Sequence, residues 1–405
     1  MQTLRDELAT TADRESVVQA WVARHDDDQL LAALEQLPPG PLAGWTLGVK
    51  DVIDTAELPT ERGSPIYKGR TTMNDASCVA LARRAGALVV GKTATTEFAL
   101  FTPTVTTNPH DSSRTPGGSS SGSAAAVAAG MVRAAFGTQT VGSVIRPASY
   151  CGVVGFKGTH QLVPMSGVGT LAQSLDTLGW FTRSVADAAT MFGALTGQSV
   201  LSTSPPAEPP RLGVYRSHQW DSAQPEMGAI LEAAAEQLAQ SGAEVVEVDP
   251  LPHLEHLFEA ANTILLYEAA RVFEWERRSH WELISPLLQR MLTRSDNVSV
   301  ADYGEAQQLV HAAKQQHDQF MADGRFDALL TPASPGEAPP LKTTGDSVFN
   351  REWTTLGVPA ATLPCFSGPM GLPVGIQFTG SRWNDLHLLE TTRWAEAALM
   401  TGDRS

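Results

Sequence analysis

The chain has 405 residues, and its 29 Lys and Arg against 44 Asp and Glu give a formal net charge of −15. An acidic surface repels a polyanion, so the composition argues against a nucleic-acid-binding protein. The sequence has no uncharged apolar run of about 18 residues, and its start, MQTLRDELAT, is too polar for a signal-peptide core. Three widely spaced cysteines, Cys78, Cys151 and Cys365, fit a reducing compartment and form no CxxC metal site. We therefore expect a cytoplasmic protein without a membrane partner.

The first part of the chain shows two kinds of hydrophobic pattern. Apolar positions at helical spacing predict a pair of surface helices over residues 1–35. After the turn-rich LPPGPLAG, short apolar runs alternate with helical patterns, as expected of an α/β sheet whose strands are buried on both faces. The apolar runs are WTLGVK, ALVVG, VRAAFG and CGVVGF, and the helical pattern CVALARRAGA lies between the first two.

The second part begins after a proline-rich connector over 202–210, which precedes a predicted strand, RLGVY. Amphipathic helices are predicted over 227–240, 253–277 and 300–321. Strand patterns then return in DALLTPA, AATLPC and PVGIQFTG, before a closing helix over 386–399. We predict one α/β domain over 1–405, made of N-terminal helices (1–40), a core (44–200), a helix-rich region (212–326) and strands and a helix that complete the core (327–400).

The most unusual composition lies over 115–143, where TPGGSSSGSAAAVAAG is followed at a short distance by GTQTVGSV. The segment starting at Gly117 has the glycine spacing of a P-loop, but Ser123 and Ala124 stand where Lys and Ser or Thr should hold phosphates. GSSSG also matches the serine elbow of hydrolases, but the polar NPHDSSRTP before it cannot be the buried strand which that motif needs. The structural alternative is a turn whose serine hydroxyls cap an alanine-rich helix.

Other motifs accompany this segment: GVKD, GKTATTEFA and GTQTVGSVIRPASYCGVVGFK. In this combination and order, the sequence closely resembles the amidase signature family, serine hydrolases with a Ser, cis-Ser, Lys triad. The resemblance covers residues 45–187 and resumes in NREWTTLGVPAATLPC and GLPVGIQFTG, whereas the middle of the chain is similar only in layout. It implies a single large α/β domain with a mixed central β-sheet covered by helices on both faces.

The resemblance also implies a role for individual residues. Lys50 of GVKD matches the catalytic lysine, Ser119 matches the serine that follows a cis peptide, and Ser143 of GTQTVGS matches the nucleophile. The oxyanion hole is matched by the backbone NH groups of four consecutive residues, Thr140, Val141, Gly142 and Ser143. This chemistry requires no metal and no cofactor.

The chemistry explains why these residue types are needed. A serine hydroxyl attacks an amide carbon only if a base takes its proton, and a lysine is a base only when it is neutral. The lysine pKa, ordinarily near 10.4, must fall by roughly three units, or about 4 kcal/mol, and burial shifts it in that direction. Ser119 would pass a proton from Ser143 to Lys50 and return it to the leaving nitrogen.

The nucleophile loop departs from the family pattern at several positions. Val141 replaces the first glycine of the usual Gly-Gly-Ser, which implies either ordinary backbone geometry or a different oxyanion loop. Gln139 and Ile145 replace an Asp and an Arg that we interpret as a structural ion pair, and Arg146 lies three residues after Ser143. This pattern is similar to the malonamidase-type branch, in which an arginine there recognises a substrate carboxylate. The alternative is that Arg146 binds backbone carbonyls beneath the loop.

The resemblance thus implies an amidase that hydrolyses a small carboxamide to an acid and ammonia or an amine through an acyl-Ser143 ester. If Arg146 binds a carboxylate, malonamate-like or ureido acids are suitable substrates. Two alternatives are a glutaminase-type subunit of an amidotransferase and a binding protein with an inactive site, the latter suggested by Val141. The expected partner is a small-molecule amide, with neither nucleic acid nor membrane, and the expected assembly is a homodimer.

Overall fold

The computed structural model describes residues 2–198 and 208–400, and within them the strands form one mixed β-sheet. The strands are β1 (Trp21–Arg24), β2 (Thr46–Lys50), β3 (Leu88–Thr93), β4 (Ala134–Gln139), β5 (Val154–Lys157), β6 (Thr177–Thr182), β7 (Arg211–Tyr215), β8 (Glu244–Val248), β9 (Ala328–Pro332), β10 (Ala360–Ser367) and β11 (Pro373–Thr379). Their order across the sheet is β1-β3-β2-β4-β6-β5-β10-β11-β9-β7-β8. The two ends of the chain meet where β5 pairs antiparallel with β10.

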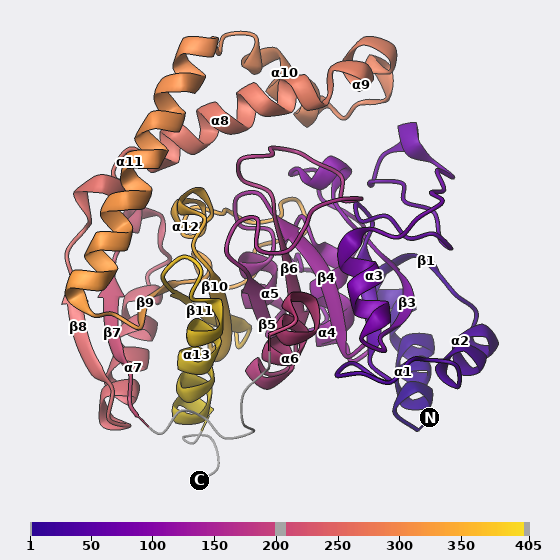
Figure 1. Cartoon of the computed structure of the whole chain (residues 1–405), viewed down its shortest axis with the longest axis horizontal. Helices are drawn as coiled ribbons and strands as arrows, with labels where there is room; N and C mark the ends of the chain where they lie inside the picture. Colours follow the sequence, from indigo (N-terminus) through magenta and orange to yellow (C-terminus); the bar gives the residue numbers. More distant parts are fainter. Residues whose placement is uncertain (1, 199–207, 401–405) are drawn as a thin grey trace.

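Helices cover both faces of this sheet, which confirms the predicted fold class. They are α1 (Gln2–Val18), α2 (Asp27–Leu34), α3 (Ser77–Arg84), α4 (Ser121–Ala128), α5 (Ile145–Cys151), α6 (Val185–Thr196), α7 (Met227–Gln240), α8 (Leu257–Val272), α9 (Glu274–Ser279), α10 (Pro286–Ser295), α11 (Val300–Gly324), α12 (Arg351–Leu356) and α13 (Asp385–Met400). In Figure 1, α8 to α11 form an arm of salmon and orange helices beyond one end of the sheet. No helix of the described ranges is long and apolar enough to cross a membrane.

Alternate residues of the central strands face two different helical layers. In β3, Val89 belongs to the core that also contains side chains of α3, α6, α7 and α13. Its neighbours Leu88 and Val90 belong to the core formed with α1, α2, α4 and α5. Period-two alternation with apolar residues on both sides is the pattern of a strand buried on both faces, as the apolar runs predict.

Most predicted elements are confirmed within a few residues, and α7 has its predicted bounds. One prediction at the N-terminus is wrong: Trp21 and Val22 were assigned to a surface helix, but they lie in β1, which pairs antiparallel with β3. The single helix predicted over 253–277 is divided between α8 and α9, after a short 3-10 turn. Most of the connector predicted over 202–210 lies outside the described residues.

A buried ion pair fixes the chain immediately after β2. Asp51, which follows Lys50, accepts a contact of 3.1 Å from Lys92 Nζ, and both side chains are buried. Lys92 also donates to Thr60 Oγ1 at 2.6 Å. The backbone NH of Glu61 donates to both oxygens of the Asp51 carboxylate, at 3.3 and 3.1 Å. The loop is thereby tied to the end of β2, the position of Lys50.

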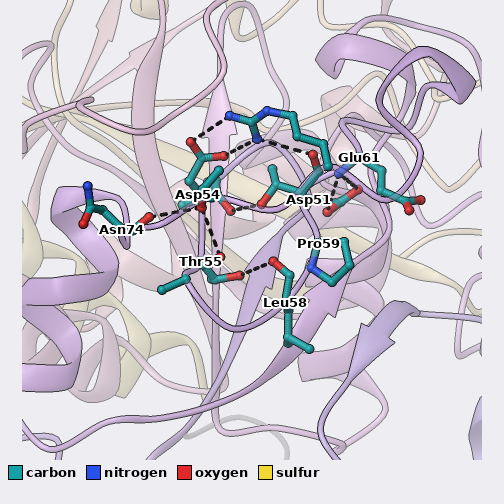
Figure 2. Close-up of polar contacts among 12 residues, drawn as sticks. Asp51, Asp54, Thr55, Leu58, Pro59, Glu61 and Asn74 are labelled. Carbon is teal, nitrogen blue, oxygen red and sulfur yellow. Dashed lines mark hydrogen bonds and ion pairs between the residues drawn. The ribbon is translucent and has the colours of Figure 1, made fainter.

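The outer part of the same loop carries a second set of polar contacts. Arg70 donates to both carboxylate oxygens of Asp54, at 2.7 and 3.2 Å. Thr55 Oγ1 donates to the Leu58 carbonyl at 3.1 Å, and Thr72 Oγ1 lies 3.2 Å from the Thr55 carbonyl. Figure 2 shows Asp51, Asp54, Thr55 and Leu58 around this one loop. The contacts cross-link the loop and hold it beside the sheet.

Replacing Lys92 by methionine leaves the buried Asp51 carboxylate without its cation. We expect the free energy of unfolding to fall by about 3–5 kcal/mol, because an unpaired buried charge keeps its full desolvation penalty. Urea denaturation followed by circular dichroism measures the change. The control Arg278→Met breaks an exposed 3.4 Å ion pair with Glu274, and it should cost less than about 1 kcal/mol. Equally small losses in both variants would contradict a structural role for the buried pair.

Candidate active site

Lys50 is the last residue of β2, between β3 and β4 in the sheet, and its side chain is fully buried. Its Nζ donates to Ser119 Oγ at 2.7 Å and to Thr138 Oγ1 at 2.8 Å. Burial lowers the pKa of Lys50 well below its ordinary value; the charge of Asp176 opposes this shift, and the charge of Arg146 adds to it. A lysine in this environment has the character of a neutral base.

Ser119 lies just before α4, and the Gly118–Ser119 peptide bond is cis. Its side chain is buried, and its carbonyl accepts the NH of Thr96 at 3.2 Å. Gly117 adopts a φ of 84°, and a Cβ there would lie 2.8 Å from the Pro147 Cα, so the turn requires glycine. The structure thus places the sequence-predicted Ser119 in direct contact with Lys50.

Small residues let α4 approach the strand ends closely. A Cβ at Gly122 would lie 2.4 Å from the Ala94 backbone nitrogen. The serine hydroxyls do not cap the helix as the structural alternative predicts: Ser120, at the N-cap, donates instead to the Thr138 carbonyl at 3.3 Å. Ser123 Oγ similarly donates to the Phe136 carbonyl at 2.8 Å. These hydroxyls therefore join α4 to β4, the strand that leads to Ser143.

The loop that carries Ser143 connects β4 to α5, and the side chain of Gln139 shapes it. Gln139 Oε1 accepts the NH groups of Val144 at 2.9 Å and Ile145 at 3.0 Å. Its Nε2 donates to Thr354 Oγ1 in α12 at 2.9 Å. A neutral amide thus holds the start of α5 where we expected a lost ion pair to leave a gap. Ser143 is almost completely buried on this loop.

The proposed oxyanion residues have ordinary backbone geometry at Val141, which is not among the described residues with positive φ. This agrees with the first of the two alternatives that the valine raised. The Val141 carbonyl accepts Thr354 Oγ1 at 3.1 Å, and its side chain packs in a core that contains Phe98 and Leu171. Gly142 lies so close to Asn350 that a Cβ would be 2.5 Å from Oδ1. The loop is therefore packed from both sides.

Asp176 is a buried carboxylate that sequence reasoning did not identify. Its Oδ1 accepts Thr140 Oγ1 at 2.6 Å. Its Oδ2 accepts the NH groups of Leu171 at 2.7 Å and Ala172 at 3.0 Å. Burial raises the pKa of Asp176 to about 6, although these hydrogen bonds lower it. The carboxylate thus joins the nucleophile loop to a second loop and lies near enough to Lys50 to act on its pKa.

Arg146 combines features of both interpretations of its role. Its Nη2 donates to the Gly118 carbonyl at 2.5 Å, directly before Ser119. The side chain is 1% exposed, and Nε and Nη1 have no hydrogen-bond partner among the described residues. Burial lowers the pKa of Arg146, and the nearby Tyr150 and Asp346 oppose that shift. Arg146 therefore binds one backbone carbonyl and keeps two unpaired donors beside the Lys50 and Ser119 pair.

A second arginine, Arg351, lies near this site and lines a cavity of about 220 Å³ under the helical arm. Its guanidinium carbon is 4.0 Å from the ring centroid of Phe258 in α8. Burial lowers the pKa of Arg351 to about 10; the charge of Asp346 opposes this shift and that of Arg146 adds to it. Arg351 stands in NREWTTLGVPAATLPC, a segment that carried the family resemblance, but no pattern in it indicated a role for this side chain.

Comparison with known sequences gives the family. The family model described as Amidase matches residues 14–389. A subunit of the glutamyl-tRNA(Gln) amidotransferase of Koribacter versatilis is 30% identical over 88% of this chain and 85% of its own length. The corresponding protein of Chloroflexus aggregans is 34% identical over 86% of this chain and 81% of its own length.

Solved structures agree with this assignment. A crystal structure of an amidase is 32% identical, with a TM-score of 0.85 over 98% of this chain and 95% of that one. The peptide amidase of Stenotrophomonas maltophilia is 29% identical, with a TM-score of 0.81 over 98% and 93%. A structure described as "An unexpected vestigial protein complex reveals the evolutionary origins of an s-triazine catabolic enzyme" is 27% identical, with a TM-score of 0.86 over 99% and 95%. The chain therefore belongs to the amidase signature family and is a hydrolase of that family.

Proposed function

We propose that this chain is a serine amidohydrolase that cleaves a small carboxamide through an acyl-Ser143 intermediate, with Lys50 as the base and Ser119 as the proton carrier. The observation that carries the proposal is the 2.7 Å contact between the buried Lys50 Nζ and Ser119 Oγ, at the end of the strand beside β4. The loop with Ser143 follows β4 directly. A neutral amine, a bridging hydroxyl and a second serine are the groups that this chemistry needs.

In the proposed reaction, Ser143 Oγ attacks the amide carbon and forms a C–O bond. Its proton passes to Ser119 Oγ, whose own proton passes to Lys50 Nζ. The negative charge on the carbonyl oxygen is stabilised by the NH donors of residues 140–143. The C–N bond then breaks as Ser119 returns a proton to the nitrogen, so that neutral ammonia or an amine leaves. Water hydrolyses the Ser143 ester by the same relay and releases the acid.

Asp176 acts in this scheme as a positioning residue. Its hydrogen bond to Thr140 Oγ1 fixes the first residue of the oxyanion loop, whose NH groups must already point at the developing charge. Its negative charge also limits how far the pKa of Lys50 falls. The same carboxylate therefore influences both the geometry of the donors and the strength of the base.

The proposed substrate is a short amide that carries a carboxylate, such as malonamate or a ureido acid, as in malonamidase-type enzymes. The support comes from Arg146, whose Nε and Nη1 are buried and unpaired among the described residues. A carboxylate can accept two parallel hydrogen bonds from one guanidinium, and it would neutralise a charge that burial disfavours. The homodimer and the cytoplasmic location remain predictions.

A glutaminase-type subunit of an amidotransferase is the second candidate. It is favoured by the names of the curated relatives, which are components of glutamyl-tRNA(Gln) amidotransferases. Against it, the nucleophile loop has Gln139 and Ile145 where the family usually has an Asp and an Arg, so its loop is held by a neutral amide. Glutamine hydrolysis and co-purification with a second protein are the observations that would favour this candidate.

Single substitutions in the triad test the mechanism. Ser143→Ala, Lys50→Ala and Ser119→Ala should each lower kcat by at least about 10³-fold, because the three groups act as one proton-transfer unit. Ammonia release measures turnover, and a labelled serine-directed probe should react with the native chain but not with Ser143→Ala. Ser112→Ala, an exposed serine of the same segment, is the control and should retain full activity. Near-normal turnover in Ser119→Ala would remove the relay.

The pH profile tests the role of Asp176. Because Lys50 works as a base only when neutral, kcat/KM should fall as the pH drops through its lowered pKa. Asp176→Asn removes a charge that raises the pKa of Lys50, so the acidic limb should move to lower pH. Weaker positioning of Thr140 should also lower kcat by roughly tenfold. A lower kcat without movement of the limb would leave Asp176 a structural role only; Asp249→Asn, at an exposed position, is the control.

A panel of amides tests the substrate class. Arg146→Ala should raise the KM for malonamate roughly ten- to a hundredfold, which is the loss of a hydrogen bond to a charged group. The KM for propionamide, which has no carboxylate, should change little. Ammonia release from malonamate, propionamide and glutamine provides the comparison, with Arg84→Ala as an exposed control. An equal loss on malonamate and propionamide would contradict carboxylate recognition by Arg146, and a strong preference for glutamine would favour the amidotransferase candidate.

A further inference from the structure

The cavity under the helical arm contains a cation without a hydrogen-bonding partner. The Nε of Arg351 is buried and has no hydrogen-bond partner among the described residues. The guanidinium is held against the Phe258 ring, which fixes its direction. None of the described residues lining the cavity is acidic. An arginine in this position has free donors for a ligand and no carboxylate nearby to occupy them.

The walls of the same cavity are apolar. Leu100 lines one side, and Leu265 of α8 with Leu288 and Met291 of α10 line the other. Such walls gain free energy by covering CH₂ groups and gain nothing from a bare inorganic anion. An apolar cavity of about 220 Å³ with Arg351 in its lining therefore fits a short hydrocarbon chain that ends in an anionic group.

The cavity lies next to the nucleophile loop. Arg351 begins α12, and Thr354, one turn later in this helix, donates to the Val141 carbonyl at 3.1 Å and accepts the side-chain NH of Gln139. Leu100, Val141 and Leu265 belong to one hydrophobic core. A ligand in the cavity would therefore share its wall with the residues that position Ser143.

Charge around the cavity also favours an anion. The chain has a net charge of −15, yet Arg290 and Arg294 of α10 join Arg351 in lining this cavity. Arg290 and Arg294 are exposed, and neither forms an ion pair with a described carboxylate. A local positive region on an acidic protein concentrates anions at the place where it lies.

We propose that this cavity binds the part of the substrate beyond the scissile amide, and that Arg351 recognises a carboxylate at the end of a short apolar chain. The inference rests on the proposed amidase function and extends its substrate class. Arg146 serves a carboxylate next to the amide, as in malonamate, whereas Arg351 serves one that lies several carbons away. The favoured class is thus the monoamides of longer dicarboxylic acids, such as adipamate.

Kinetics with a series of chain lengths separate the two arginines. Arg351→Gln should raise the KM for adipamate about tenfold or more, because a charge-assisted hydrogen bond is lost. The KM values for hexanamide, which has the same length without the carboxylate, and for malonamate should stay within about twofold of the native values. Arg84→Gln, an exposed arginine of α3, is the control. An equal loss on adipamate and hexanamide, or no loss on either, would overturn the inference.

A binding measurement tests the same site without turnover. Isothermal titration calorimetry with adipate should give a Kd that is about tenfold weaker in Arg351→Gln than in the native chain, and unchanged in Arg84→Gln. Arg351→Lys, which keeps the charge, should recover part of the affinity. Binding that depends on Arg351 in a chain that hydrolyses no amide would refute the proposed function and leave the site intact. Adipate binding that is the same in the Gln and Lys variants would refute the site, whatever the activity.

Discussion

The contact between Lys50 and Ser119 sets the terms for the rest of the structure. A lysine beside a serine hydroxyl is useful as a base only when neutral, and complete burial is what lowers its pKa in this chain. Burial in turn requires a strand in the middle of the sheet, with β3 and β4 as its neighbours. It also requires α4, whose small residues let the backbone of Gly122 approach Ala94. The glycine and serine composition is therefore a consequence of where this lysine must lie.

Neighbouring charges are arranged so that they do not undo this effect. Asp51 is the next residue in the chain, and an unpaired carboxylate there would hold a proton on the lysine. Its charge is taken up by Lys92 at 3.1 Å instead. The charges that do act on the pKa of Lys50 are those of Asp176 and Arg146, and they have opposite signs. Desolvation is thus left as the dominant influence on the base.

Local motifs predicted the residues that lie within contiguous segments, and missed those that meet only after folding. Lys50, Ser119 and Ser143 each lie in a short motif, so the order of motifs was sufficient. Gln139 was recognised as a departure from the pattern, but its role depends on Thr354, which is 215 positions away. Asp176 has no motif of its own, and its function arises from contacts with Thr140. β1 was mistaken for helix because four residues are too few to show alternation.

The two arginines near the site are costly features that a ligand would complete. Buried donors without partners carry a desolvation penalty, and a folded chain gains nothing from leaving them unpaired. Asp346 acts on the pKa of both Arg146 and Arg351, but one carboxylate cannot neutralise two guanidinium groups. Positive charge is therefore in excess beside the nucleophile loop of a strongly acidic protein. Such local exceptions to good packing are expected at functional sites, and an anionic substrate would supply the missing charge.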